Sequence, residues 1–276
     1  MTQIKDNTRP LQNEIQEIRG YKVVKHNDLV QKARFQLSLQ EQKVILFMIS
    51  KLKPETIDFT YQDFSIIEFC KICGIDYNNG KNYKNVKDTI KALADKSAWL
   101  KLDKDTETLV RWINKVTISK KSGLIKLRLD DDMKPFLLQL QQNFTSYELL
   151  YTLAMRSQYS VRLYELFKSY EWRRRCKFDM EGLKKILFAE QYKRFPDFKR
   201  YVLDIAMREI NDLTDIAVEY EIIKVGRKYG GIEFSIRTKK DLQERMKAWS
   251  NIEEVLDPPR ISLFSNIEDK MEGGNK

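Results

Sequence analysis

Two cysteines, one histidine and three consecutive aspartates are the side chains in this sequence that could hold a metal or carry a reaction. Cys70 and Cys73 form a CxxC pair, but a structural zinc needs about four ligands, and the sequence has no second CxxC and no Cys/His pair. His26 is the only histidine, so the paired histidines that hold the metal of DNA-nicking tyrosine enzymes are excluded. The apolar pattern IIEFCKICGI predicts that the cysteines are helix core.

The run Asp130, Asp131 and Asp132 could bind a divalent metal, as nuclease carboxylates do. It also directly precedes the helix-like pattern MKPFLLQLQQ, where aspartates cap free N–H groups and Pro135 is tolerated in the first turn. We expect the cap, with no metal and no cofactor. A GxxxxGK[ST] phosphate loop is absent from the sequence, and the glycines of GRKYGG fall between two strand patterns, where glycine serves a turn. The sequence therefore predicts no catalytic site.

Basic side chains form the second chemically distinctive set. The chain has 50 Lys and Arg against 40 Asp and Glu, a net charge of +10 and a pI near 9.3. This balance is typical of proteins that meet phosphates. The candidate DNA contacts lie in two clusters, each made of a helix pattern and the strand turn that follows it: Lys193, Arg194, Lys199, Arg200, Arg208, Asn211, Arg227, Lys228 and Tyr229 in one, and Lys81, Lys84, Lys87, Lys91, Lys120 and Lys121 in the other.

The helix predicted at residues 196–213 must position the first of these clusters. At about 100° per residue its apolar side chains fall on one stripe, and the opposite face carries Asp197, Arg200, Asp204, Arg208 and Asn211. Charges at spacing four also form a salt ladder on a solvated helix face. We expect DNA contact because the helix start and the following turn are both basic, with the planar fork of Arg200 gripping guanine and Asp204 orienting it.

The elements around both clusters follow the same order. Ser38 and Glu41 form a capping box for a buried helix at residues 38–51. A short strand (57–61), two helices (63–74 and 83–96) and strands near 99–102, 109–119 and 123–129 are expected next. The second half repeats this order with a helix at 160–170, a strand at 176–178, helices at 179–189 and 196–213, and strands at 217–225 and 231–239.

A helix pair followed by a two-stranded hairpin is the winged-helix variant of the helix-turn-helix. The sequence thus predicts an α+β fold with two tandem winged-helix domains, at residues 21–142 and 143–249, between mobile tails at 1–20 and 250–276. A polar linker is expected near residues 142–146, before a capping box of Thr145 and Glu148. The longest apolar run is VILFMI and the N-terminus is polar, so we expect a cytoplasmic protein with no membrane partner.

Three tracts resemble the Rep-type replication initiators of iteron plasmids and related small circular replicons. They are LSLQEQKVILFMIS (37–50), FTSYELLYTLAMRSQYSVRLYELFKSY (144–170) and REINDLTDIAVEYE (208–221), and the resemblance covers about residues 21–240. It implies a non-enzymatic initiator that binds direct repeats of double-stranded DNA (iterons) at an origin, mainly through the second unit, and helps to open AT-rich DNA beside them. It also implies a homodimer, formed mostly through the first unit, that represses its own promoter, with host replication proteins as further partners.

Three alternatives stay open at this point. A winged-helix transcriptional regulator would show the same recognition surface, and a single palindromic operator in place of direct repeats would favour it. A metal-dependent DNA-nicking enzyme would use the aspartates at 130–132 or a tyrosine nucleophile, which a nicking assay with Mg²⁺ tests. A protein-interaction module with this architecture would show a flat salt response of DNA affinity.

Overall fold

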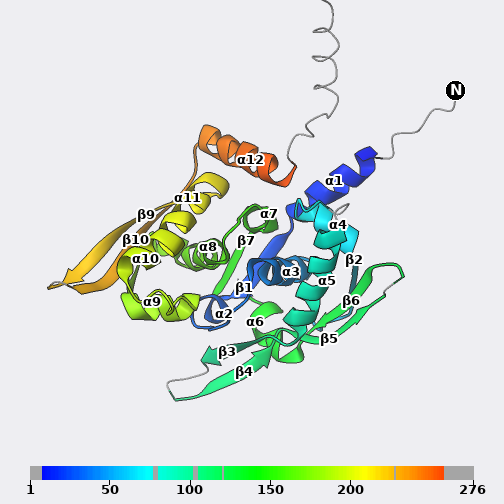
Figure 1. The fold of residues 1–276 in the computed structure, drawn as a ribbon, viewed down its shortest axis with the longest axis horizontal. Coiled ribbons are helices and arrows are strands. Elements are labelled where there is room, and N and C mark those ends of the chain that lie inside the picture. The colour runs from blue at the N-terminus through cyan, green and yellow to red at the C-terminus, as the bar shows by residue number, and fades with distance from the viewer. Residues whose placement is uncertain (1–7, 77–79, 102–104, 120, 227, 258–276) are drawn as a thin grey trace, which may run out of the picture.

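The computed structural model describes residues 8–76, 80–101, 105–119, 121–226 and 228–257. In Figure 1 most elements of the first half of the chain lie to the right and most of those of the second half to the left, while the β3–β4 hairpin extends to the lower left. Helix α1 (Thr8–Arg19) precedes the first unit, and helix α12 (Leu242–Leu256) follows the second. Apolar side chains of both units belong to one continuous core.

The first unit contains the helices and strands expected of a winged helix, together with an additional hairpin, β3–β4. Its elements are β1 (Lys22–His26), α2 (Asn27–Gln31), α3 (Leu39–Ser50), β2 (Gln62–Ser65), α4 (Ile66–Ile72), α5 (Gly80–Ala94), β3 (Ser97–Lys101), β4 (Glu107–Arg111), β5 (Ile113–Ile118), β6 (Leu124–Leu129), η1 (Asp131–Met133) and α6 (Lys134–Leu137). The wing is the antiparallel hairpin β5–β6, and β2 pairs with the other edge of β6.

The second unit repeats this plan around the three-stranded sheet β8-β10-β9. Its elements are β7 (Phe144–Glu148), α7 (Leu149–Leu153), α8 (Gln158–Tyr170), η2 (Glu171–Arg173), β8 (Arg175–Asp179), α9 (Met180–Leu187), α10 (Phe195–Phe198), η3 (Lys199–Leu203), α11 (Asp204–Leu213), β9 (Ile216–Val225) and β10 (Lys228–Thr238). The hairpin β9–β10 is the wing of this unit and extends to the left in Figure 1.

Helix caps begin these helices where the sequence predicts them. Ser38 Oγ accepts a hydrogen bond from the Glu41 N–H at 3.3 Å, and the Ser38 N–H donates to Glu41 Oε2 at 2.7 Å, which is the predicted capping box of α3. Asp179 Oδ1 accepts from the Gly182 N–H at 2.7 Å and caps α9. Each cap satisfies backbone donors that an isolated helix end leaves without a partner.

Two local predictions are wrong. Residues 57–61 form no strand; the strand is β2, at Gln62–Ser65, and Ile57 is 75% exposed. The helix expected to reach residue 141 ends at Leu137, because Leu138 is extended and Gln139 adopts a left-handed φ of 52°.

The expected polar linker and the expected tails also need correction. The strand β7 occupies residues 144–148 and pairs with β1, from Lys22↔Glu148 to His26↔Phe144, so strands from both predicted units share one sheet. Thr145 therefore caps no helix, and its hydroxyl donates to Asn27 Oδ1 at 2.6 Å. Residues 8–19 and 250–256 are helical rather than mobile tails, while residues 1–7 and 258–276 lie outside the described part of the chain. The domain boundary at residues 142 and 143 stays a prediction.

A buried charged cluster joins β1, β7 and α8 at the junction of the two units. The Lys25 ammonium and the Tyr147 hydroxyl both donate to Glu165 Oε1, and Arg162 Nη1 lies 3.6 Å from Glu165 Oε2. Burial alone would raise the pKa of Glu165, but Lys25 and Arg162 together hold it below its ordinary value. The carboxylate is thus ionised and bonded from both units, which fixes the register between them.

Candidate nucleic-acid interface

Residues 195–213 form one helical segment, which we call the reading helix, built from α10, η3 and α11. Its core face contains Phe198, Val202, Ala206 and Ile210, all fully buried as predicted from the helical period. The central turn, Lys199–Leu203, is π-helical, so one extra residue is accommodated within the helix. This turn changes which side chains share a face.

The pairing of Asp204 follows from the π turn. Lys199 Nζ donates to both carboxylate oxygens of Asp204, at 2.7 and 2.9 Å, across a spacing of five residues. The Tyr220 hydroxyl of β9 also donates to Asp204 Oδ1 at 3.4 Å. The prediction that Asp204 orients Arg200 is therefore wrong, because the carboxylate is occupied by Lys199.

Arg200 and Arg208 are exposed and lack an ion-pair partner among the residues that the structure describes. The Arg200 guanidinium lies 5.3 Å from the ring centroid of Tyr201, within the range of a cation–π contact. Both arginines therefore keep their hydrogen-bond donors for a ligand. An arginine fork with free donors on an exposed helix face matches the acceptors of guanine in the major groove.

The start of the reading helix is basic. Lys193 and Arg194 are exposed, and Arg194 donates through Nε and Nη2 to Asp197, at 2.8 and 3.0 Å. The side chain of Arg194 is 78% exposed, so this ion pair is weak and its charge remains accessible from solvent. A basic helix start of this kind suits a phosphate group.

The wing of the second unit is attached to the reading helix through aromatic rings. Tyr229 of β10 stacks on Phe195, with centroids 4.2 Å apart and an interplanar angle of 24°. Lys228 is exposed at the beginning of β10, and Arg227 lies outside the described residues. Lys224 of β9 is also exposed, 5.9 Å from the Tyr229 ring. It was not among the predicted contacts, although its position one residue before the end of the predicted strand at 217–225 places it near the wing turn.

Asn211 has a structural role in α11. Its Oδ1 accepts from the Val218 N–H at 2.7 Å, and its Nδ2 donates to the Val218 carbonyl at 3.0 Å. These two bonds fix the first strand of the wing to the reading helix. We therefore leave Asn211 out of the proposed DNA contacts.

The first unit has the same arrangement with lysines in place of arginines. Lys81, Lys84 and Lys91 are exposed on α5 and Lys87 is half-buried. Lys121 is exposed at the wing turn, and Lys120 lies outside the described residues. Gly123, at a φ of 67°, fits closely against Tyr83 of α5, because an added Cβ would lie 2.3 Å from the Tyr83 hydroxyl oxygen. An aromatic residue near the start of the second helix thus contacts the wing in both units.

The side chains first considered for metal binding or catalysis are either buried in the core or hydrogen-bonded within the fold. Cys70, Cys73 and Cys176 are buried free thiols, and burial raises the pKa of Cys70 to about 11 and that of Cys73 to about 12. Asp130 Oδ1 caps η1, as predicted, and Asp131 pairs with Arg128 and Lys134, whose hydrogen bonds lower its pKa to about 2.

Two further structural findings apply only to the described residues. Within that part of the chain, no cluster of three or more His, Cys, Asp or Glu side chains could hold a metal ion. The helices described there include none that is long and apolar enough to span a bilayer.

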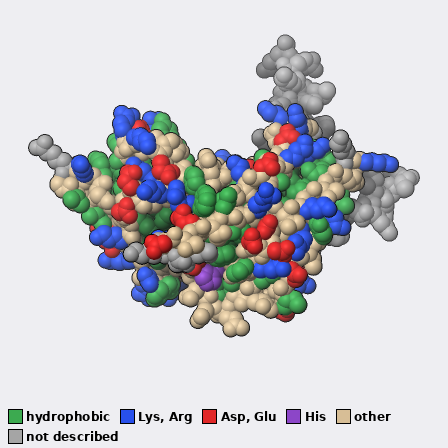
Figure 2. All heavy atoms as spheres, turned by 90° about the horizontal axis from the view of Figure 1, so that it is seen from below, with side chains coloured by type: hydrophobic (Ala, Val, Ile, Leu, Met, Phe, Trp, Pro, Cys, Tyr) green, Lys and Arg blue, Asp and Glu red, His purple; other side chains and the backbone are tan. Residues whose placement is uncertain are grey.

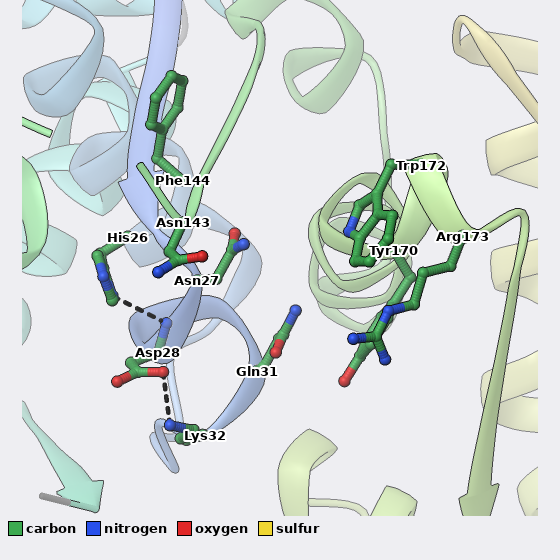
Figure 3. A pocket seen from close by; sticks show the side chains of 10 residues that line it. All are labelled: His26, Asn27, Asp28, Gln31, Lys32, Asn143, Phe144, Tyr170, Trp172 and Arg173. Atoms are coloured by element: carbon green, nitrogen blue, oxygen red, sulfur yellow. Dashed lines mark hydrogen bonds and ion pairs between the residues drawn. The ribbon is translucent and has the colours of Figure 1, made fainter. Parts of the chain in front are cut away.

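A separate hollow of about 760 Å³ lies between α2, the start of β7 and η2. Figure 3 shows Trp172, Tyr170 and Arg173 on one side of it and His26 and Asp28 on the other. The adjoining end of β8, Arg175, pairs with Ser235, whereas the other end, Asp179, pairs with Gly231 beside the wing turn. The hollow therefore lies near the base of the β9–β10 hairpin and away from the wing turn. Seen from below in Figure 2, the described side chains of the molecule show blue and red groups interspersed.

Comparison with known proteins gives two family matches along the chain. Residues 22–168 match the first winged-helix domain (WH1) of the initiator replication proteins, and residues 179–236 match the second (WH2) of the initiator Rep proteins. Together they span well over half of the chain, and they confirm both the two tandem winged-helix units and the resemblance seen in the sequence.

Two solved structures are also similar. The crystal structure of the Pi initiator protein in complex with iteron DNA aligns with a TM-score of 0.67 at 21% identity, over 81% of this chain and 99% of that one. The WH1 domain of MSBI1.176, a replication protein isolated from a multiple sclerosis patient, aligns with a TM-score of 0.28 at 14% identity, over 36% of this chain and 79% of that one.

Proposed function

This chain belongs to the initiator replication protein family, and we propose that it binds directly repeated double-stranded DNA sites at the origin of a plasmid or small circular replicon. The observation that carries the proposal is the repeated placement of a helix against its own wing, through Phe195 and Tyr229 in one unit and Tyr83 and Gly123 in the other. The fold shared with Pi, whose structure holds iteron DNA, supports the same ligand.

The two units divide the work according to the chemistry of their cations. In the second unit Arg200 and Arg208 supply donors for base edges. The phosphate contacts there are Lys193, Arg194, Lys199, Arg227, Lys228 and Tyr229, to which the structure adds Lys224. In the first unit the lysines Lys81, Lys84, Lys87, Lys91, Lys120 and Lys121 contact phosphates, because an ammonium is a point charge without a planar fork. The second unit therefore reads the sequence and the first positions the protein.

The buried cluster around Glu165 supports simultaneous binding by both units. Lys25 in β1 and Arg162 and Glu165 in α8 hold the two halves in one register. Two winged helices in a fixed register span about two turns of DNA, or roughly 20 base pairs. The proposed site is a direct repeat of that length.

We extend the proposal to the roles that accompany origin binding. The protein helps to open AT-rich DNA beside the repeats, represses its own promoter as a homodimer formed through the first unit, and works with host replication proteins in the cytoplasm, where the replicon lies. These steps require binding and no bond cleavage by the chain itself.

Origin binding is tested with a duplex that carries the repeats lying beside the open reading frame. The expected result is saturable binding to the repeats, much tighter than to a scrambled duplex of equal length at one fixed salt concentration. Footprinting should show one protected segment of about two helical turns per repeat. Protection of a single palindrome alone would identify a transcriptional regulator, and a nick in supercoiled origin DNA with Mg²⁺ would identify an enzyme.

A further inference from the structure

Tyr201 is an exposed aromatic side chain on the reading helix and is not part of the hydrophobic core. It lies within the π turn and is 45% exposed. Its ring stacks on Tyr192, with centroids 5.9 Å apart and planes inclined by 23°. Tyr192 in turn meets Tyr159 of α8 edge-on, at 6.2 Å. The Tyr201 ring is therefore supported from behind, and its orientation is restrained before any ligand binds.

Tyr201 shares the exposed side of the helix with the two free arginines. Tyr201 is the chain neighbour of Arg200, and Tyr201 and Arg208 are both exposed. The Arg200 guanidinium lies 5.3 Å from the Tyr201 ring centroid. An apolar ring thus stands among cations on the same surface. A base edge that meets Arg200 therefore also comes within reach of this ring.

The major groove presents one apolar group, the C5-methyl of thymine. Hydrogen-bond donors such as arginine cannot recognise a methyl group, whereas a restrained ring can cover it and exclude water. We propose that the Tyr201 ring contacts the C5-methyl of one thymine in the site and so selects thymine over cytosine or uracil at that position. The inference rests on the proposed function, because it assumes that the reading helix lies in the major groove.

The experiment removes single methyl groups from DNA. The probe is a duplex selected by the wild-type protein from a random duplex library, together with copies in which each thymine is replaced, one at a time, by deoxyuridine. For the wild type, one replacement should weaken binding about fourfold, the effect of one buried methyl group, and the others should change little. Tyr201→Ala should bind the thymine and deoxyuridine copies equally at that position.

Two variants separate a ring contact from other effects. Tyr201→Phe keeps the ring and should retain the wild-type sensitivity to the deoxyuridine replacement. If this variant loses that sensitivity, the hydroxyl reads the base and the methyl contact is wrong. Trp172→Ala removes a 74% exposed aromatic ring away from the wing turn and should retain the wild-type pattern.

The outcomes that contradict the inference are distinct from those that contradict DNA reading itself. If Tyr201→Ala keeps the wild-type sensitivity at every thymine, or if the wild type has none, the contact is wrong while origin binding stands. If the wild type enriches no duplex from the library, the proposed function fails and the contact fails with it.

Discussion

Phe195 and Tyr229 stack with ring centroids 4.2 Å apart and planes inclined by 24°, and this contact attaches the wing of the second unit to the start of the reading helix. The base of the wing is attached independently on the other strand, where Asn211 bonds both backbone groups of Val218. The hairpin is thus held at two points relative to the reading helix, so the proposed phosphate contact by the wing and the proposed base contact by the helix should depend on each other.

The stack should be measurable as a coupling energy in the absence of DNA. A double-mutant cycle of Phe195→Ala and Tyr229→Ala, followed by urea unfolding, should give a coupling of about 0.5–1.5 kcal/mol, as found for aromatic pairs. Phe195→Ala combined with Trp172→Ala is the matched control and should be additive, because Trp172 lies near the base of the hairpin, away from the stack at the wing turn. Additivity in both cycles would show that the stack does not hold the wing.

Phosphate contact by the wing should appear in the salt dependence of binding. Replacing Arg227 and Lys228 by Gln should weaken cognate and scrambled duplexes alike and reduce the slope of log K against log salt by about two, because each cation releases about one condensed counterion. Arg173→Gln with Arg174→Gln removes the same charge and should leave the slope unchanged; Arg173 lines the hollow of Figure 3, and Arg174 lines a second hollow that shares Trp172 with it. Equal slopes for the wild type and the wing variant would exclude the wing from the phosphate surface.

Arg200 should carry sequence discrimination. Arg200→Ala is expected to cost about 1–3 kcal/mol on the cognate duplex and less on a scrambled one, because only the cognate duplex places guanine at the free fork. Arg194→Ala is the matched control: the side chain of Arg194 is 78% exposed at the helix start, which we propose to contact phosphate, so this variant should bind both duplexes more weakly in proportion. Anisotropy titrations at one salt concentration give the ratio of the cognate affinity to the scrambled affinity. If Arg200→Ala leaves this ratio unchanged, the reading role would belong to α5.

The parts of the fold that depend on neighbouring residues could be predicted from the sequence. Ser38 with Glu41 and Asp179 cap the predicted helices, and the buried stripe of the reading helix follows its period. The pairing of β1 with β7 could not be predicted, because its partners, such as Lys22 and Glu148, lie 126 residues apart and each strand is too short to specify the other.

The contacts of the side chains on the reading helix could also be predicted only in part. One extra residue in a helix has no local signature, so the spacing of four between Arg200 and Asp204 suggested an ion pair that the π turn gives to Lys199. Tyr201 was not among the predicted contacts, because the residues assigned to the outer face of this helix were the charged ones and Asn211. A large aromatic residue that falls outside the apolar stripe of a helix is the signal that could have revealed Tyr201.

Glu165 should make the stability of the junction depend on pH. Its folded-state pKa lies below the ordinary value near 4.3, so the stabilisation is fully present above about pH 4.3 and is lost as the pH falls through the folded-state pKa. Glu165→Gln leaves Lys25 and Arg162 buried without their anion and should cost about 3–5 kcal/mol near neutral pH. Glu254→Gln removes the same charge from an exposed position on α12 and should change the free energy of unfolding little.

Urea unfolding of the wild type and the two variants between about pH 3 and about pH 7, on both sides of the ordinary glutamate pKa, measures both effects. The wild type should lose more stability than Glu165→Gln as the medium becomes acidic, so that the two curves converge. Parallel curves would show that Glu165 does not hold the junction through its charge.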